Sequence, residues 1–345
     1  MSVNQNFYGV AKMRKKLSKK QLETISQATF NKCHQIGFKH AKENVSYMKN
    51  TIFDVKKENI KSDIGIVISA GPSLHSKKPY KQILDSEFKG TVICADGALY
   101  YCLRKGVVPD YVVSVDPHPT RIIRLFGDPE MESVPEDDYF RRQDLDPALN
   151  NDEIRRNKEV IKLVNKHGRK IKMIISTSIT PKITRRCLEA GMELYWWNPI
   201  YDDYDKENSF TRQLFDMNKV PCMATGGNVG TSAWVFAASV LGIKNIALVG
   251  MDLGYSPSTP LHRTQYYYEL KEIFKDKIKD GFMEIYNPYL KETWYTDPAY
   301  YWYRESFLEL AQLVDCNTYN CTEGGILFGE GVEFAKLKDF LKRFK

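Results

Sequence analysis

The sequence of 345 residues lacks the features of several protein classes. Its longest nearly continuous apolar run, from Trp234 to Ile243, is shorter than the ~20 residues that a membrane-spanning helix needs, and the N-terminus MSVNQNFYGV has no apolar stretch typical of a signal peptide. The seven cysteines form no CxxC pair, so we expect core thiols and no zinc site. These absences predict a globular cytoplasmic protein.

Two common phosphate-binding patterns are also missing. No G-x-G-x-x-G follows the first apolar strand, and no G-x-x-x-x-G-K-[ST] occurs, which disfavours a dinucleotide dehydrogenase and a P-loop ATPase. The formal net charge of +7 fits anionic small molecules, an acidic membrane surface or nucleic acid, and by itself selects none of them.

Basic residues gather near the N-terminus, in the run AKMRKKLSKK at residues 11–20. Ser18 and Gln21 form a capping box for a predicted helix that continues to about Lys49. The simplest interpretation of the run is a solvated helix start, with a membrane-surface or nucleic-acid patch as the alternative. We do not expect a nucleic-acid partner.

From Asp63 onward, short apolar runs rich in β-branched residues alternate with helical segments. The predicted strands are residues 64–69, 91–95, 111–115, 171–176, 193–197 and 245–250. This alternation is typical of an α/β fold with a Rossmann-like, doubly wound and mostly parallel sheet. Residues 126–160 are acidic and polar, and we interpret them as a long excursion between the third and fourth strands.

We predict three parts along the chain: a basic helical segment at 1–62, the Rossmann-like core at 63–255, and a mainly helical extension at 256–345 that covers one edge of the site. The strand pattern stops after Tyr255, and helices are expected near 264–278, 302–315 and 333–344.

Small and acidic residues follow the predicted strands, where an open parallel sheet binds ligands. Strand one leads into Gly71, Pro72, Ser73 and Leu74, a turn that suits a phosphate or a helix cap. Three other strand ends carry Asp96, Asp116 and Asp252. These carboxylates are expected to line one crevice, where they would bind ribose hydroxyls, a substrate amine or a divalent metal. The alternative is that each caps a helix or bonds a neighbouring loop.

A second loop, Thr225 to Ser232, is rich in glycine and hydroxyl groups and opens an apolar helix. The loop amides and side chains suit a phosphate or a carboxylate. Its candidate donor-binding residues are Thr225, Gly226, Gly227, Asn228, Thr231 and Ser232.

Histidine is scarce, with six in all, and His262 lies in a loop beside Arg263 and several tyrosines. A neutral imidazole there could accept a proton from an attacking hydroxyl while Arg263 steadies a leaving phosphate. A structural hydrogen bond is the alternative role for His262. Two aromatic clusters, at 195–204 and 294–303, could stack on a sugar or base, although packing is their more common use.

With these residues in hand, the chain resembles the 6-hydroxymethylpterin diphosphokinase MptE-like family, which includes the central domain of the motility accessory factors that glycosylate flagellin. The matching pieces are Gly71 to Leu74 and residues 94–117, 225–256 and 320–334. The pterin enzymes of this family transfer diphosphate from ATP and want a second acid shortly after the third-strand aspartate. Here Asp116 is followed by Pro117, His118 and Pro119.

The segment at 320–334 and the extension around His262 look instead like the motility accessory factors, which are related in fold to sialyltransferases. By that resemblance Gly71 to Leu74 and the loop from Thr225 to Ser232 would hold a CMP-activated donor, and His262 would be the general base. The leading hypothesis is a glycosyltransferase-like transferase for a CMP-activated nonulosonic acid or a similar nucleotide sugar, with Asp116 or Asp252 orienting donor or acceptor.

Two alternatives remain. A diphosphokinase would use ATP and Mg²⁺, with Asp96 and Asp116 as metal ligands. A non-catalytic module would bind a nucleotide or a sugar through the same loops. Under the leading hypothesis no cofactor is assigned, because the CMP-sugar donor is a substrate. The acceptor protein or glycan and the oligomeric state stay open.

Overall fold

The computed structural model describes residues 34–55, 60–133 and 150–344. The basic run at 11–20 and the predicted capping box lie outside the described residues, as do residues 134–149 of the acidic excursion. The expected N-terminal helix is described over residues 34–44 and ends in the 3₁₀ turn η1 (Val45–Tyr47).

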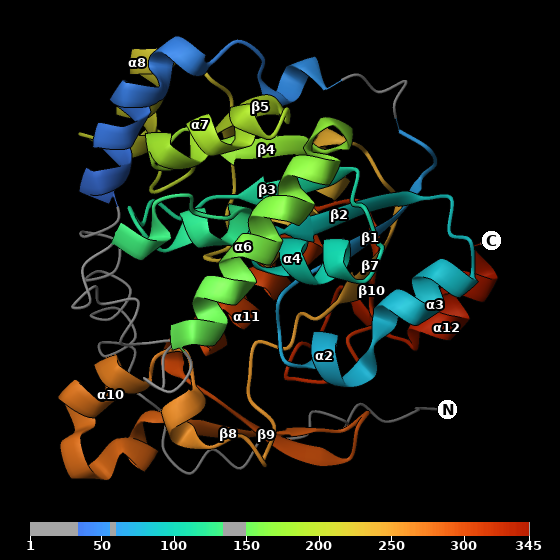
Figure 1. Ribbon diagram of the computed structural model, residues 1–345. Coiled ribbons are helices and arrows are strands. Elements are labelled where there is room, and N and C mark those ends of the chain that lie inside the picture. The colour runs from blue at the N-terminus through green and yellow to red at the C-terminus, as the bar shows by residue number, and fades with distance from the viewer. Residues whose placement is uncertain (1–33, 56–59, 134–149, 345) are drawn as a thin grey trace.

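One sheet of nine parallel strands organises the molecule (Figure 1). The strand order is β11-β10-β7-β1-β2-β3-β4-β5-β6. The predicted α/β class with a Rossmann-like parallel sheet is confirmed. The strands are β1 (Ile64–Ile68), β2 (Thr91–Ala95), β3 (Tyr111–Ser114), β4 (Lys172–Ser176), β5 (Glu193–Pro199), β6 (Cys222–Met223), β7 (Asn245–Val249), β10 (Asn317–Asn320) and β11 (Val332–Phe334).

Helices connect the strands and cover both faces of the sheet. They are α2 (Ser73–Lys77), α3 (Pro79–Asp85), α4 (Asp96–Arg104), α6 (Asn150–His167), α7 (Pro181–Glu189), α8 (Phe210–Asn218), α9 (Val229–Val235), α10 (Tyr267–Phe274), α11 (Pro298–Leu313) and α12 (Leu337–Arg343). Shorter 3₁₀ turns are η2 (Ile52–Asp54), η4 (Ile122–Phe126), η5 (Met131–Ser133), η7 (Gly168–Lys170), η9 (Leu261–Arg263) and η10 (Lys275–Gly281), and the π-helical turn η8 (Phe236–Val240) extends α9.

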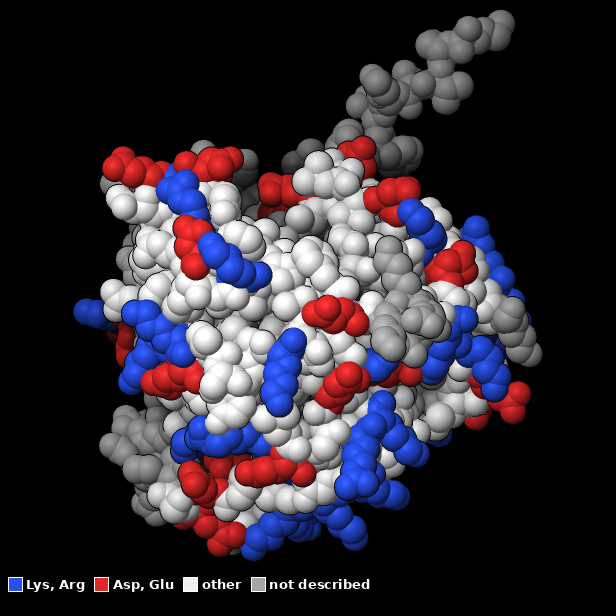
Figure 2. Space-filling model, turned by 90° about the horizontal axis from the view of Figure 1, so that it is seen from above, with Lys and Arg blue, Asp and Glu red and all other residues white. Residues whose placement is uncertain are grey.

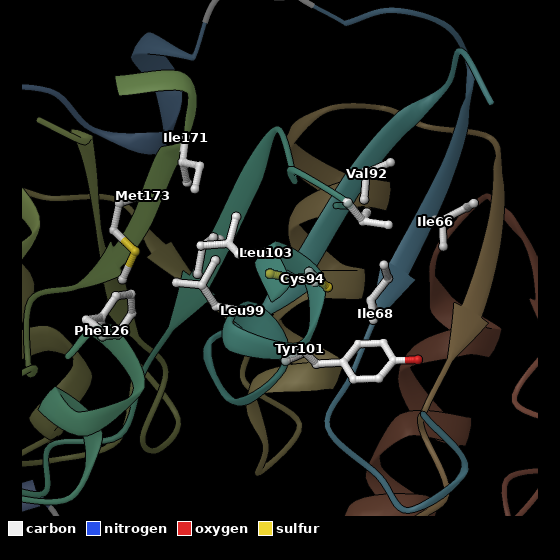
Figure 3. Packing of buried hydrophobic residues seen from close by; sticks show 14 of the residues in the cluster. Ile66, Ile68, Val92, Cys94, Leu99, Tyr101, Leu103, Phe126, Ile171 and Met173 are labelled. Carbon is white, nitrogen blue, oxygen red and sulfur yellow. The ribbon is translucent and has the colours of Figure 1, made fainter. Parts of the chain in front are cut away.

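Alternating strand side chains build two hydrophobic cores, one on each face of the sheet. In β1, Ile66 and Ile68 join the core beneath α3, α4, α6, α7 and α12, whereas Val67 joins the core beneath α9 and α11. Figure 3 shows side chains of the first core, including Ile66 and Ile68 of β1 and Leu99 of α4. Because the central strands are buried on both faces, their sequences are continuously apolar.

The C-terminal part differs from the expectation that the strand pattern stops at Tyr255. The predicted helices appear as α10, α11 and α12, but β10 and β11 extend the main sheet, and β8 (Met283–Asn287) pairs with β9 (Glu292–Thr296) in an antiparallel hairpin. The strand β10 has the sequence NTYN, and its polar side chains gave no apolar run to detect. Its buried Asn320 is satisfied by a bond to the carbonyl of Leu327 at 2.6 Å.

The hairpin β8–β9 and α10 lie together at the end of the molecule opposite α8 (Figure 1). On the face seen in Figure 2, charged side chains of both signs lie around the margin, and a broad central area carries few charges. None of the described helices combines the length and the apolar character needed to cross a bilayer.

Candidate functional site

The strand order places the ends of β7, β1, β2 and β3 side by side, and all four strands run in the same direction. The chain moves outward from β1 to β6 in one direction and then returns to add β7 on the other side of β1. A sheet with this reversal has a switch point, here between β1 and β7, where the carboxyl ends leave a crevice for ligands. The predicted loops after β1, β2 and β7 adjoin that point, and Asp116 follows β3. The loop at 225–232 follows the edge strand β6 and returns to the end of β1, where Gly230 packs against Ser69.

The loop after β1 is held against the end of β7. The Ser73 hydroxyl donates to Oδ2 of Asp252 at 2.7 Å, and the Gly71 amide donates to the carbonyl of Gly250 at 2.8 Å. A Cβ at Gly71 would lie 2.1 Å from Oδ2 of Asp252, so glycine permits this approach. Leu74 is buried in the core, whereas Pro72 is exposed.

Asp252 lies at the end of β7, as expected, and is deeply buried there. Its side chain is 1% exposed, and burial raises the pKa of its carboxyl to about 7 against the lowering effect of the Ser73 hydrogen bonds. The loop after β10 closes over it, because the Ile326 amide bonds the Asp252 carbonyl at 2.8 Å and Gly324 and Gly325 pack against the residue. Asp252 therefore joins two loops, which is the alternative role expected for it, and its role in orienting a substrate stays a prediction.

Asp96 and Asp116, by contrast, are neighbours at the ends of β2 and β3. The pKa of Asp96 is raised to about 6, chiefly by burial and to a smaller extent by the nearby charge of Asp116. Hydrogen bonds from the Ser114 hydroxyl and the Gly97 amide oppose this shift. Asp116 is partly exposed and accepts from the His118 amide at 2.9 Å. The structure thus brings Asp96 and Asp116 together, as the sequence predicted for these strand ends.

Arg121 adds a positive charge to this pair. It lies in the loop after β3, and its charge lowers the pKa of Asp96. The Gln265 carboxamide lies against its guanidinium, and with its oxygen turned to Arg121 it accepts from Nη1 at 3.0 Å. Sequence reasoning missed Arg121, although its position five residues after Asp116 on a loop at the carboxyl edge was a usable signal.

The loop from Thr225 to Ser232 forms a tight turn at the start of α9. Asn228 caps the helix by accepting from the Thr231 amide at 2.9 Å, and the Ser232 hydroxyl bonds the Asn228 carbonyl at 3.1 Å. Thr231 and Ser232 are fully buried, and their hydroxyls make hydrogen bonds within the turn. Their assignment as ligand-binding groups stays a prediction. Within the part of the chain that the structure describes, the backbone N–H groups of Gly226 and Val229 have no hydrogen-bond acceptor.

This turn faces the end of β1. A Cβ at Gly230 would lie 2.5 Å from the Ser69 hydroxyl, so the start of α9 packs directly against the last residues of β1. Ser69 was not singled out in the sequence. Its hydroxyl is buried and has no partner among the described residues.

Tyrosines from the C-terminal part cover the edge next to this turn. The Tyr255 hydroxyl donates to Oδ2 of Asp297 at 2.7 Å, and the Tyr266 and Tyr303 hydroxyls are 2.9 Å apart. Asp297 is fully buried, and burial raises the pKa of its carboxyl to about 6. Burial raises the pKa of Tyr300, and the charge of Arg121 partly opposes this shift, which places the tyrosine cluster close to the carboxylate pair.

His262 and Arg263 lie in η9 and are exposed. No hydrogen bond joins the His262 ring to any described residue. Gln265 follows two residues after Arg263 and contacts Arg121, so the segment is anchored beside the carboxylate pair. The role of His262 as a general base and that of Arg263 as a phosphate ligand stay predictions.

No group of three or more His, Cys, Asp or Glu side chains within residues 34–55, 60–133 and 150–344 is placed to hold a metal ion. Asp96 and Asp116 nevertheless form a pair of carboxylates, and Mg²⁺ is often bound by one or two carboxylates together with substrate phosphates.

The strand order defines a Rossmann-like protein, and the loops at its switch point form a candidate ligand site at the carboxyl edge. Residues 39–130 match the family described as 6-hydroxymethylpterin diphosphokinase MptE-like, so the resemblance expected from the sequence is confirmed. No curated protein matches the chain.

Among solved structures, the Maf glycosyltransferase from Magnetospirillum magneticum AMB-1 has a similar fold, with a TM-score of 0.52 and 14% sequence identity. The likeness covers 87% of this chain and 38% of that chain, so this protein spans well under half of its structural neighbour. At this identity the likeness shows the fold.

Proposed function

We propose that the protein is a transferase that uses a nucleotide-activated sugar, with a CMP-activated nonulosonic acid or a similar donor. One observation carries the proposal: the turn with the free Gly226 and Val229 amides packs against β1 at the switch point, through Gly230 and Ser69. Backbone N–H groups at such a turn suit the phosphate of a nucleotide.

In the proposed reaction the bond between the sugar and the CMP phosphate breaks as the acceptor oxygen bonds to the sugar. His262 takes the acceptor proton, and the phosphate leaves with the bonding electrons. The turn at 225–230, Arg263 and the newly found Arg121 would stabilise the developing negative charge. Asp116, the accessible member of the carboxylate pair, would orient donor or acceptor.

Ligand-induced thermal stabilisation tests the donor class. A ligand that binds only the folded state raises the melting temperature by mass action, so CMP, CDP, ATP and GTP should be compared with and without Mg²⁺. We expect stabilisation by cytidine nucleotides in the absence of metal. Stabilisation confined to ATP with Mg²⁺ would reject this donor class.

That second outcome would favour a diphosphokinase, which the proximity of Asp96 and Asp116 supports as a second candidate. The two carboxylates would then hold Mg²⁺, which would supply charge stabilisation for diphosphate transfer. A third result, tight binding of a cytidine nucleotide without turnover of any CMP-sugar, would indicate a binding module.

The role of His262 has its own test. General-base catalysis is typically worth about 10² to 10⁴ in rate, so His262→Ala should lose turnover by that factor and keep donor affinity. His75→Ala is a matched control, because His75 is also exposed but packs its ring against Tyr101 on α4. Equal losses of affinity and turnover in His262→Ala would refute the assignment.

A further inference from the structure

Trp302 stands apart from the other tryptophans. All five lie in the described part of the chain; Trp196, Trp197 and Trp234 are fully buried and Trp294 is 7% exposed, whereas Trp302 is 42% exposed. It lies on α11 within the aromatic cluster 294–303, to which the proposed function gives no role.

Packing of α11 does not account for Trp302. The helix is anchored on the sheet by Phe307 and Ala311, which are 0% and 6% exposed, and the Phe307 ring lies 4.9 Å from that of Trp234. Trp302 adds little to this buried contact, because a large part of its indole faces solvent.

The indole instead rests on the turn at 225–230. A Cβ at Gly227 would lie 2.3 Å from Cζ3 of Trp302 and 2.5 Å from Cδ1 of Tyr303, so both rings touch the turn where it has no side chain. The two ring centroids are 5.5 Å apart with planes inclined by 58°. The Tyr303 hydroxyl is fixed by Tyr266 at 2.9 Å, so this wall is held in place.

We propose that Trp302, supported by Tyr303, is a stacking surface for the nucleobase of the nucleotide whose phosphate binds the turn at 225–230. The inference rests on the proposed function, since it assumes a nucleotide ligand there. A base is joined to its phosphate through a single ribose, and the indole borders the same turn, so one nucleotide reaches both. Base–aromatic stacking tolerates any base, because every base has a π-face.

Titration of the full-length protein with CMP tests the inference through Trp302 itself. Because the other tryptophans are buried, acrylamide should quench mainly Trp302 fluorescence, and bound CMP should protect it. Trp302→Ala should weaken CMP binding by about 5- to 150-fold, the equivalent of about 1–3 kcal/mol for one stacked base. Trp302→Phe should retain most of the affinity.

Leu313→Ala is the matched control, because Leu313 lies at the end of the same helix and is 81% exposed. It should leave CMP affinity unchanged. Unchanged affinity in a folded Trp302→Ala variant, with the wild type still binding CMP, overturns the stacking surface and leaves the proposed function standing. Loss of affinity for a CMP-sugar but not for CMP would place the sugar on the indole and overturn the base assignment. A wild type that binds no nucleotide refutes both proposals.

Discussion

Asp252 illustrates how burial changes the acidity of a carboxyl at a strand end. Its carboxyl accepts from Ser73 and is enclosed by glycines 71 and 324, so replacing either glycine would force side-chain atoms onto it. A buried carboxyl without a full ion pair keeps its proton to higher pH, which is why its pKa rises from the ordinary 3.8 to about 7.

This shift predicts a pH-dependent stability. Between pH 4 and 7 the folded state holds a proton that the unfolded carboxyl has released, so the free energy of unfolding falls as pH rises through this window. Asp252→Asn removes this pH dependence, because the amide does not titrate in this range. As the pH rises from 4 to 7.5, the free energy of unfolding of the variant should therefore increase relative to that of the wild type. The increase is at most about 4 kcal/mol, at 1.36 kcal/mol per pKa unit.

Urea unfolding at both pH values measures this gain. Asp96 and Asp297 also have raised pKa values, but both proteins contain them, so their effects cancel in the comparison. A difference between the two proteins that is the same at both pH values would contradict the prediction.

Strand ends could be read from the sequence, but their side-chain partners could not. Asp96 and Asp116 follow neighbouring apolar strands, so their proximity was predictable. Arg121 contacts Gln265 from a distant part of the chain, and Ser69 faces Gly230, and no local pattern reports either contact. Burial of Asp252 was also hidden, because it depends on a loop that follows β10.

The turn at 225–230 packs closely against α11. Gly227 has φ +82° and lies directly beneath Trp302 and Tyr303, so both its backbone and its missing side chain are required there. Gly242 has a similar φ of +73°, but a Cβ at that position would meet nothing within 4 Å. Comparing alanine substitutions at Gly227 and Gly242 therefore distinguishes the cost of backbone strain from the cost of side-chain overlap.

Gly227→Ala should destabilise the protein more than Gly242→Ala. Both variants pay for a left-handed backbone, about 1–2 kcal/mol, and Gly227→Ala adds an overpacking cost of typically about 1–3 kcal/mol. Denaturant unfolding of the two variants measures the difference. Equal losses of stability would show that α11 does not press on the turn.

The apolar content of each strand decided whether the sequence predicted it. Strands β1, β2, β3, β4, β5 and β7 are nearly continuous apolar runs and were found within a few residues of their bounds. β6 has two residues, and β10 is built from polar side chains whose burial is satisfied by tertiary hydrogen bonds. A pattern based on hydrophobicity could not detect either one.

At the scale of the whole molecule, the predicted site edge is assembled from segments at both ends of the chain. β7 lies between β1 and β10, and the loop after β10 closes over Asp252 at the end of β7. The C-terminal part is therefore a component of the main sheet as well as a cover, and the predicted boundary at Tyr255 divides strands that pair with one another.

The pairing of β1 with β7 also sets the order of events during synthesis. β7 begins about 180 residues after β1 ends, so at roughly 5–20 residues per second the ribosome needs about 10–35 s to deliver it. During that time β2 can pair with one edge of β1, which has the sequence IGIVI, while the other edge of β1 stays unpaired. An exposed apolar edge invites aggregation, so the nascent chain is most vulnerable before β7 emerges.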